Sequence, residues 1–294
     1  MTSPSPRVSV CIPAYNEERS ITRCLDSVLH QRGCELDEIL VGVNSSTDRT
    51  RSIVGAYGRG DPRVRVVDSS KGKANAWNAL NRKARNTLRF FQDGDCFVHP
   101  DTYRAMLAEY DEALDILGAS LERDVDGAGP IVRIMNFPRR FVTAAPELNG
   151  GLYLLNFERV ARALHRHGLA QMPETILNDD QLLHWICSSV KVSDHAFVVS
   201  TPASSIAEEI RRHVRMEAGR EDLRARFPNE RGRMEPDDWR RGALYRWLYG
   251  FKSATITEKV LYPVVTPVKF LLFRYVSWQA HRTTRKGNGV ISWK

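Results

Sequence analysis

The stretch Phe90-Phe91-Gln92-Asp93-Gly94-Asp95-Cys96 joins an apolar run to two carboxylates that are separated by a glycine. A buried strand that ends abruptly in acidic residues would give this pattern. The glycine would let the backbone bend so that both carboxylates face one crevice. Two hard oxygen ligands there would suit Mg²⁺ or Mn²⁺ carrying a diphosphate, although Asp-Gly-Asp is also a good sequence for an ordinary turn.

Strands and helices are expected to alternate along the first hundred residues. Short apolar runs bounded by proline, asparagine and aspartate predict buried strands, and periodic apolar residues between them predict amphipathic helices. This alternation is typical of a parallel sheet with crossover helices, in which ligands bind beyond the carboxyl ends of the strands. The strands are expected at residues 8–12, 38–43, 64–67 and 88–92, with polar segments 13–17, 44–50 and 93–95 at three of their carboxyl ends.

The composition favours a globular protein with anionic partners. The chain has 294 residues, of which 42% are hydrophobic, and this is enough for a proper core. Its formal net charge of +8 and its sequence pI of about 9.4 favour nucleotide phosphates, anionic lipid headgroups or nucleic acid. We expect no nucleic-acid partner, because the basic residues form no single tract and no zinc-finger, homeodomain or RNA-recognition signature occurs.

The cysteines indicate a reducing compartment. Five cysteines lie far apart with no Cys-x-x-Cys pair, so they are expected to be reduced packing thiols. The first ten residues contain no apolar segment of the kind found in signal peptides. The expected location is therefore the cytoplasm, with the inner face of a membrane as a further option.

Two common nucleotide-binding motifs are missing from the sequence. Gly-x-Gly-x-x-Gly does not follow the first expected strand, which argues against an NAD enzyme. Gly-x-x-x-x-Gly-Lys-Ser/Thr is missing as well, which argues against a P-loop phosphotransferase.

Four segments together resemble a known family. They occur in the order, and at roughly the intervals, seen in the family 2 glycosyltransferases of GT-A fold, and the resemblance covers roughly residues 7 to 220. It implies an α/β fold with a Rossmann-like mixed sheet flanked by helices, a nucleotide-diphosphate sugar donor, a divalent metal and inversion at the anomeric carbon. The four segments are Val8 to Glu17, Asn44 to Thr50, Lys73 to Asn78, and Asp93-Gly94-Asp95.

The resemblance also implies roles for particular residues. The metal ion, Mg²⁺ or Mn²⁺, would bind Asp95 together with Asp93. One departure concerns the base of the donor: members commonly carry an acidic residue where this chain has Val43. The expected donor is nevertheless a UDP-sugar, because uracil is the usual base. Residues implied to bind the nucleotide sugar are Pro13, Ala14, Tyr15, Glu17, Asn44, Lys73 and Asp93.

Inverting transfer needs a carboxylate that removes the proton of the acceptor hydroxyl. Asp179 and Asp180 begin an apolar helical stretch that resembles the acidic pair of the family. Asp180 occupies the position of the base, and Asp179 stands where glutamate is usual. Both acids also suit a helix N-terminus, where negative charge is favoured.

Further polar residues in the second half are candidates for the site. Arg215 and Arg212 could stabilise the leaving diphosphate, since guanidinium groups bind phosphates bidentately, although a solvated basic helix face is equally compatible. Met216 stands where processive members carry Trp, so a single sugar should be transferred. His195 could be a third metal ligand or a structural residue. Gly150 and Gly151 could permit close approach to a ligand or form a bulge.

The expected domain is residues 1–220, with a nucleotide-binding half at about 7–96 and an acceptor half at about 97–220. Residues 221–294 are expected to form a charged loop and an apolar, aromatic extension of helical character. Prolines and charges interrupt the extension too often for a membrane-spanning helix. Residues 247–286 would then either pack on the core or a partner subunit, or lie on a membrane surface.

Two other functions remain compatible with the sequence. A sugar nucleotidyltransferase has a similar sheet but makes the nucleotide sugar, and would require a nucleoside triphosphate. A non-catalytic scaffold that binds nucleotide or membrane would not hydrolyse a sugar donor. The acceptor of a transferase would be a small molecule or a lipid-linked compound.

Overall fold

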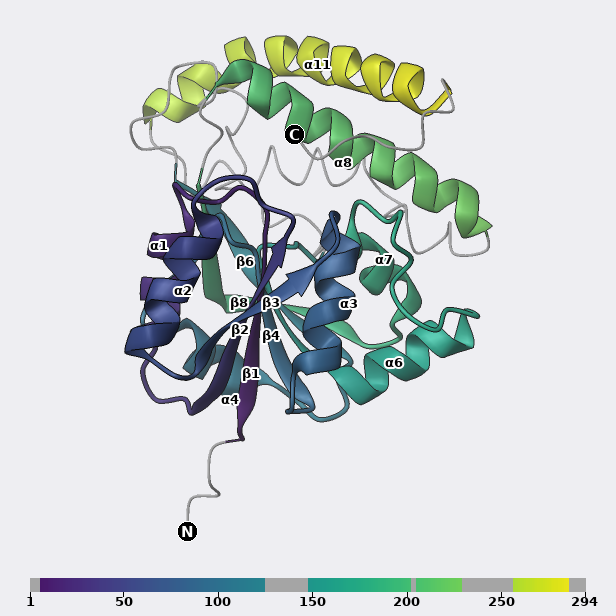
Figure 1. The fold of residues 1–294 in the computed structure, drawn as a ribbon. Helices are drawn as coiled ribbons and strands as arrows, with labels where there is room; N and C mark the ends of the chain where they lie inside the picture. The colour runs from purple at the N-terminus through teal and green to yellow at the C-terminus, as the bar shows by residue number, and fades with distance from the viewer. Residues whose placement is uncertain (1–5, 125–147, 202–204, 229–255, 286–294) are drawn as a thin grey trace. The chain divides into compact units, whose positions relative to one another are not determined.

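The four apolar runs of the N-terminal half form parallel strands in the computed structural model (Figure 1). The structure describes residues 6–124, 148–201, 205–228 and 256–285. Strand β1 pairs in parallel with both β2 and β4, and β2 pairs in parallel with β3. The predicted parallel arrangement is confirmed. The strands are β1 (Val8–Ala14), β2 (Leu36–Asn44), β3 (Val64–Ser69) and β4 (Leu88–Gln92).

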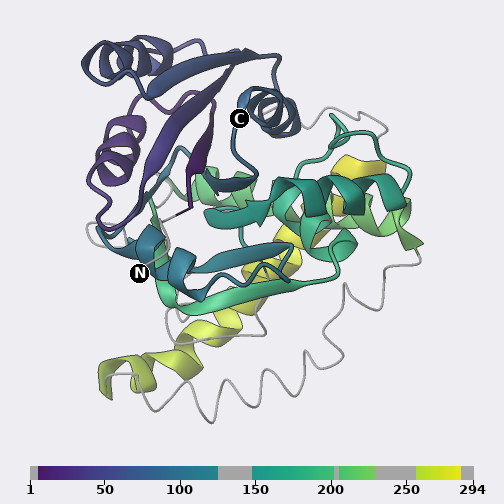
Figure 2. The same cartoon turned by 90° about the horizontal axis from the view of Figure 1, so that it is seen from below.

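Helices cover both faces of these strands. In Figure 2, α1 and α2 lie on one side of the purple strands, and α3, the third helix of the chain, lies on the other. Gly42 of β2 lies close to the third helix, because a Cβ there would meet Leu80 Cδ1 at 3.0 Å. The helices are α1 (Ile21–Leu29) and α2 (Thr50–Gly60) on one side and α3 (Lys73–Lys83) on the other.

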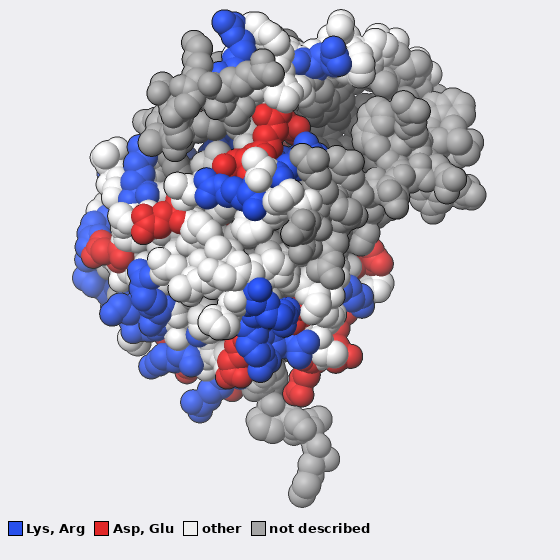
Figure 3. All heavy atoms as spheres, turned by 90° about the vertical axis from the view of Figure 1, so that its right-hand side faces the viewer, with Lys and Arg blue, Asp and Glu red and all other residues white. Residues whose placement is uncertain are grey.

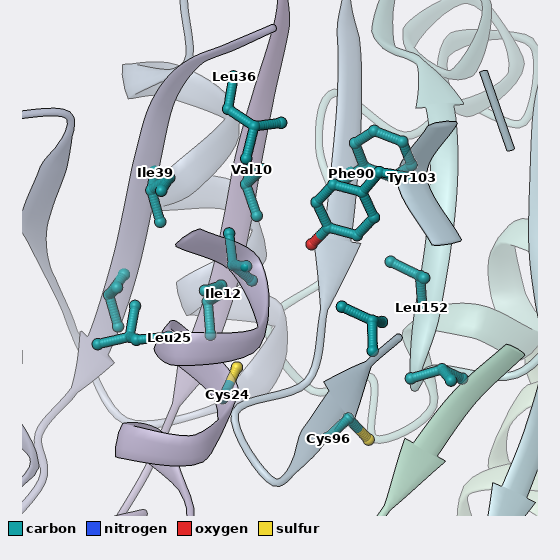
Figure 4. Close-up of a cluster of buried hydrophobic side chains, with 14 of the residues drawn as sticks. Val10, Ile12, Cys24, Leu25, Leu36, Ile39, Phe90, Cys96, Tyr103 and Leu152 are labelled. Carbon is teal, nitrogen blue, oxygen red and sulfur yellow. The ribbon is translucent and has the colours of Figure 1, made fainter. Parts of the chain in front are cut away.

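A hydrophobic core fills the space between the strands and α1 (Figure 4). Val10 and Ile12 of β1 and Leu25 of α1 are fully buried there. Phe90 of β4 stacks on Tyr103, with ring centroids 4.0 Å apart. Because β4 is anchored on this side, its carboxyl end carries the acidic turn at a fixed place in the sheet.

Antiparallel strands extend the sheet beyond β4. Strand β7 pairs with β4 on one side and with β6 on the other, and β8 pairs with β5. The sheet is therefore mixed, with eight strands in the order β3-β2-β1-β4-β7-β6-β8-β5. The further elements up to residue 200 that the structure describes are β5 (Cys96–Val98), α4 (Thr102–Glu109), β6 (Ile116–Arg123), β7 (Leu152–Asn156), α6 (Phe157–Arg166), α7 (Asp179–Ile186) and β8 (Val190–Ser200).

Glu38 is a buried acid at the amino-terminal edge of the parallel strands. Its side chain is fully buried. Oε1 accepts hydrogen bonds from Ser9 Oγ at 2.7 Å and from the backbone N–H of Arg85 at 2.6 Å. Oε2 pairs with Arg65. Both carboxylate oxygens therefore have donors.

Asp115, just before β6, is a second well-paired acid. Oδ1 accepts from Arg159 Nε at 2.7 Å, and Oδ2 accepts from the backbone N–H groups of Ser188 and Ser189 at 2.9 and 3.1 Å. Burial by itself would raise the pKa of Asp115, but these donors hold its pKa below the ordinary value. This acid joins the start of β6 to α6 and to the segment before β8.

The chain divides into two compact units. The first comprises residues 1–121 and 148–200, and the second comprises residues 122–147 and 201–294. The second unit contains α8 (Ile206–Arg226) and α11 (Ile256–Arg285), which confirms the expected helical extension. The expected boundary near residue 220 stays a prediction, and α8 runs through that position.

Helix α11 continues through Pro263 and Pro267 for 30 residues. Among the described residues, no helix is both long enough and apolar enough to cross a membrane. The charged loop was expected at 221–241, but residues 221–226 belong to α8. Residues 229–241 of that loop, and the start of the apolar tract at 247–255, lie outside the described residues.

The surface charges are dispersed. On the face shown in Figure 3, lysine and arginine side chains lie among acidic and uncharged ones over the described part of the chain. This distribution agrees with the lack of a single basic tract in the sequence.

Candidate active site

The candidate site lies where β1, β2 and β4 end. Ala14 of β1 lies opposite Val43 of β2, so the loops that follow these two strands start side by side. The acidic turn Asp93 to Asp95 follows β4, which pairs with the other edge of β1. The chain thus brings three of the polar segments predicted from the sequence to one edge of the sheet.

Hydrogen bonds join the loop after β1 to the loop after β2. The backbone N–H groups of Asn16, Glu17 and Glu18 donate to Ser46 Oγ, Thr50 Oγ1 and Asp48 Oδ2 at 3.1, 2.8 and 3.0 Å. Asn16 and Ser45 have positive φ values of 55° and 60°. Asn tolerates this left-handed backbone better than most residues. The two loops therefore form one polar wall beside the strand ends.

That wall lies directly against the Asp-Gly-Asp segment. A Cβ at Gly94 would meet Glu17 Cγ and Pro13 O at 3.3 Å and Ala14 Cβ at 3.4 Å. The Cys96 N–H also donates to Asp93 O at 3.0 Å, so the segment is a turn. Both interpretations of the motif are therefore compatible: a tight turn brings two carboxylates to the strand ends.

Lys73, at the start of α3, joins two parts of the site. Its Nζ lies 2.8 Å from Asp93 Oδ1 and 3.0 Å from Asp179 Oδ1. Its side chain is 14% exposed, against 28% for Asp93 and 2% for Asp179. Burial by itself lowers the pKa of Lys73, but the carboxylates of Asp179, Asp93 and Asp180 raise this pKa well above its ordinary value. Lys73 is therefore a permanent cation between acids.

The acids outnumber the positive charge that Lys73 supplies. Burial, with the nearby carboxylates of Asp95 and Asp179, raises the pKa of Asp93 to about 7 despite the opposing effect of Lys73. A raised carboxyl pKa means that the anionic form is disfavoured where it stands. Further positive charge at this position would stabilise the ionised acid.

Gly150 lies in the middle of these groups. A Cβ there would meet Lys73 Nζ at 2.9 Å, Asp93 Oδ2 at 3.4 Å and Asp180 Cγ at 3.6 Å. The glycine thus allows the backbone to approach all three side chains. Asp180, half-buried in the first turn of α7, faces the same small space as Asp93.

Trp77 and Tyr153 also belong to the site, although no motif in the sequence indicates this. Tyr153 OH donates to Asp179 Oδ2 at 2.9 Å and accepts from Trp77 Nε1 at 3.1 Å. Burial and the Asp179 carboxylate raise the pKa of Tyr153 well above its ordinary value, so its hydroxyl stays a donor. Phe91 stacks on both rings at centroid distances of 5.5 Å. The aromatic character of position 153 was visible in the sequence, but its contact with a residue 76 positions away was not.

The other residues predicted to bind the nucleotide sugar lie in two parts of the chain. Tyr15 is half-buried, with Lys71 Nζ 5.1 Å from its ring centroid. Asn44, the last residue of β2, is 1% exposed. Arg212 and Arg215 are half-buried on α8, in the second unit.

The side chains at the site supply some, but not all, of the oxygen ligands that a hard cation needs. Asp93 and Asp95 offer carboxylate oxygens, which Mg²⁺ and Mn²⁺ prefer. Within the described ranges no group of three or more His, Cys, Asp or Glu side chains could hold a metal by itself, and exposed His195 on β8 therefore belongs to no such group. A cation here would take further oxygens from water or from a ligand's phosphates, as Mg²⁺ commonly does.

The fold is that of the GT-A glycosyltransferases. Two solved structures share it at 17% and 20% sequence identity, with TM-scores of 0.60 and 0.52. One is the mannosyltransferase PcManGT from Pyrobaculum calidifontis in complex with GDP-Man and Mn²⁺, and covers 99% of this chain and 89% of its own. The other is S. aureus TarS 1-349 in complex with UDP, and covers 96% of this chain and 92% of its own.

The sequence comparison then defines the family. The model of the family "Glycosyl transferase family 2" matches residues 9–167 of this chain. The chain therefore belongs to this family. Residues of this chain are 29% identical over 181 positions to the uncharacterized glycosyltransferase EpsJ of Bacillus subtilis (strain 168). They are 33% identical over 129 positions to an Escherichia coli chondroitin synthase.

These relatives are longer than the matched region. The match to EpsJ spans 60% of this chain and 52% of that protein, and the match to the chondroitin synthase spans 43% and 19%. The chain therefore carries a glycosyl transferase family 2 domain, which supports a transferase enzyme. This domain favours glycosyl transfer over both a sugar nucleotidyltransferase and a non-catalytic scaffold.

Proposed function

We propose that this protein is a metal-dependent, inverting glycosyltransferase that moves one sugar from a UDP-sugar to an acceptor hydroxyl. The observation that carries the proposal is the group of Lys73, Asp93, Asp179 and Asp180 around Gly150, at the carboxyl ends of the parallel strands. Ligands of open α/β sheets bind at such an edge. The acceptor would be a small molecule or a lipid-linked compound, and the reaction would take place in the cytoplasm.

The donor would lie on the wall formed by the loops after β1 and β2. Pro13, Ala14, Tyr15 and Glu17 would contact the nucleoside, and Asn44 would lie at the neighbouring strand end. Related structures bind GDP-Man, UDP and UDP-GlcNAc, which supports a nucleotide-sugar donor. Uridine is our proposed base.

Mg²⁺ or Mn²⁺ would be held by Asp95 together with Asp93, and would supply positive charge against the departing diphosphate. The raised pKa of Asp93 supports this, because the ionised acid lacks sufficient positive charge around it. Lys73 would hold Asp93 in place and contact the diphosphate. The roles expected for Arg212 and Arg215, which lie in the second unit, stay predictions.

Asp180 would act as the base. The acceptor oxygen attacks the anomeric carbon as its proton passes to the Asp180 carboxylate, and the bond between that carbon and the diphosphate oxygen breaks. The products are the inverted glycoside and a nucleoside diphosphate. Asp179, buried and held by Tyr153 and Lys73, would position the start of α7 and would not touch the acceptor.

A thermal-shift screen of nucleoside diphosphates with Mn²⁺ tests the donor class. UDP with Mn²⁺ should raise the melting temperature more than GDP, ADP or CDP does, since bound ligand stabilises the folded state. If no nucleoside diphosphate shifts the melting temperature with Mn²⁺ or Mg²⁺, the proposal fails. A larger shift with GDP would overturn the uridine assignment alone.

Asp95→Ala tests the metal assignment. Calorimetric titration with UDP and Mn²⁺ should show at least a tenfold weaker affinity for this variant, while UDP binding in EDTA should be similar for both proteins. Unchanged affinity in Mn²⁺ would contradict the role of Asp95. Release of UDP from a UDP-sugar in water would separate a transferase from a scaffold.

A further inference from the structure

Helix α11 has an apolar face that the described chain does not cover. Exposed apolar side chains occur from Ile256 to Trp278, at positions that a helix of 3.6 residues per turn brings to one face. Among the described residues, all the large apolar side chains that are strongly exposed lie on this helix. They are Ile256, Val260, Val264, Val268, Phe270, Leu271, Tyr275 and Trp278, and we call them the outer face.

The opposite face of the same helix is buried. Val265, Val276 and Ala280 are at most 8% exposed, and their spacing places them away from the outer face. Helix α11 runs along α8 within the second unit (Figure 1). His281 Nδ1 also lies 3.0 Å from Glu221 Oε1 of α8. One side of α11 therefore packs within the second unit. The outer face has no packing partner among the described residues.

The charges on α11 favour an anionic partner. Residues 256–285 contain a single acid, Glu258, against five lysines and arginines. Arg274 and Arg282 are exposed, and the Arg282 guanidinium lies 4.6 Å from the Trp278 ring centroid. An apolar helix face with aromatic and basic side chains is typical of a helix lying in a membrane interface.

Other occupants fit the outer face less well. A second copy of the helix would bring like charges together, because each face carries Arg274 and Arg282 and little negative charge. A position across the bilayer does not fit either, since no described helix meets the requirements for a membrane span. At about 1.5 Å per residue, the 30 residues of α11 would cover about 45 Å of membrane surface.

We propose that α11 docks the protein on an anionic membrane surface, in the plane of the interface, with its outer face inserted among the acyl chains. Tyr275 and Trp278 lie at the level of the headgroups, and Arg274 and Arg282 contact lipid phosphates. The inference goes beyond the proposed transfer reaction, and binding to lipid does not depend on the donor site.

Flotation of the full chain with lipid vesicles tests this proposal. The protein should float with vesicles of phosphatidylcholine and phosphatidylglycerol, and bind at least tenfold more weakly to pure phosphatidylcholine. The double variant Val264→Glu plus Leu271→Glu places two charges on the outer face and should lose at least tenfold in affinity for the anionic vesicles.

Arg59→Glu is the charge-matched control. It also lowers the net charge by two, at an exposed position of α2 in the other unit, and should bind the vesicles nearly as well as the wild type. Circular dichroism and urea unfolding confirm that both variants fold. Failure of the wild type to float, equal losses in both variants, or a dimer that only the double variant disrupts would each overturn the proposal.

Discussion

Acidic side chains lie at both ends of the parallel strands, but only those at the amino-terminal edge have enough hydrogen-bond and charge partners. At the amino-terminal edge, both oxygens of fully buried Glu38 have donors, among them Ser9 Oγ and the Arg85 N–H. At the carboxyl-terminal edge, Asp93 and Asp179 both pair with Lys73, and the pKa of Asp93 is raised to about 7. A fully paired acid is a structural element. An acid short of positive charge is suited to bind a cationic ligand.

Removing charge from the shared lysine should have the largest effect on stability. Lys73→Met keeps the aliphatic stem but leaves Asp179, which is 2% exposed, without its cation. The unfolding free energy at pH 7, measured in urea, should fall by about 3–5 kcal/mol, as expected when one partner of a buried ion pair is lost.

Ser9→Ala is the matched change at the other edge. Glu38 would keep the Arg85 N–H and Arg65, so the unfolding free energy should fall by only about 1 kcal/mol. Equal losses in the two variants would show that the two acidic groups are held alike, against the comparison.

Two matched tyrosine substitutions distinguish a positioning role of Tyr153 from a contribution to packing alone. Tyr153→Phe removes the hydroxyl between Trp77 and Asp179, and Tyr103→Phe removes a buried hydroxyl that donates to Gln92 Oε1 at 2.8 Å. Both should lose about 1–3 kcal/mol of unfolding free energy. Only the first should lower kcat, about tenfold, with the donor KM nearly unchanged, because it releases Asp179 and the start of α7.

Steady-state kinetics with urea unfolding of the same samples provides the test. A fall in kcat of similar size in both variants would mean that loss of packing, rather than release of Asp179, explains the effect. A wild-type kcat for Tyr153→Phe would remove Tyr153 from the account of the site.

Replacing Asp115 should change the stability as little as Ser9→Ala does, and this change should depend on pH. The folded-state pKa of Asp115 lies below the value of about 3.9 for an unfolded Asp, so its contribution is present above about pH 4. That contribution is lost as the pH falls through the folded-state pKa. Asp115→Asn should be less stable than the wild type by about 1 kcal/mol at pH 7, and the difference should shrink toward pH 3. A difference that stays constant from pH 7 to pH 3 would contradict the assignment.

The first half of the fold could be predicted from the sequence because each signal is local. The runs around Val10 and Phe91 are apolar and end at Pro13 and Asp93, so strand and loop are both visible in a few residues. Strands β7 and β8 are harder to predict from the sequence. Strand β8 carries exposed Lys191, Asp194 and His195, which hide its apolar alternation. The place of β7 between β4 and β6 depends on antiparallel pairing that no local pattern specifies.

In the candidate site, too, local motifs could be predicted from the sequence, whereas contacts between distant residues could not. Asp93, Asp180 and Gly150 were found from motifs, and the structure brings them together around one small space. The bond from Tyr153 to Asp179 and the bridge made by Lys73 join residues 26 and 106 positions apart. Only the folded chain reveals such contacts, because they depend on how α3, β7 and α7 pack.

The most direct test of the account is Asp180→Asn. We expect the rate of sugar transfer to fall by about 10²–10⁴-fold, because the acceptor proton loses its base. Calorimetric affinity for the UDP-sugar with Mn²⁺ should stay within about twofold of the wild type, since this side chain is not assigned to the donor. A variant that transfers sugar at the wild-type rate would contradict the central claim that Asp180 activates the acceptor.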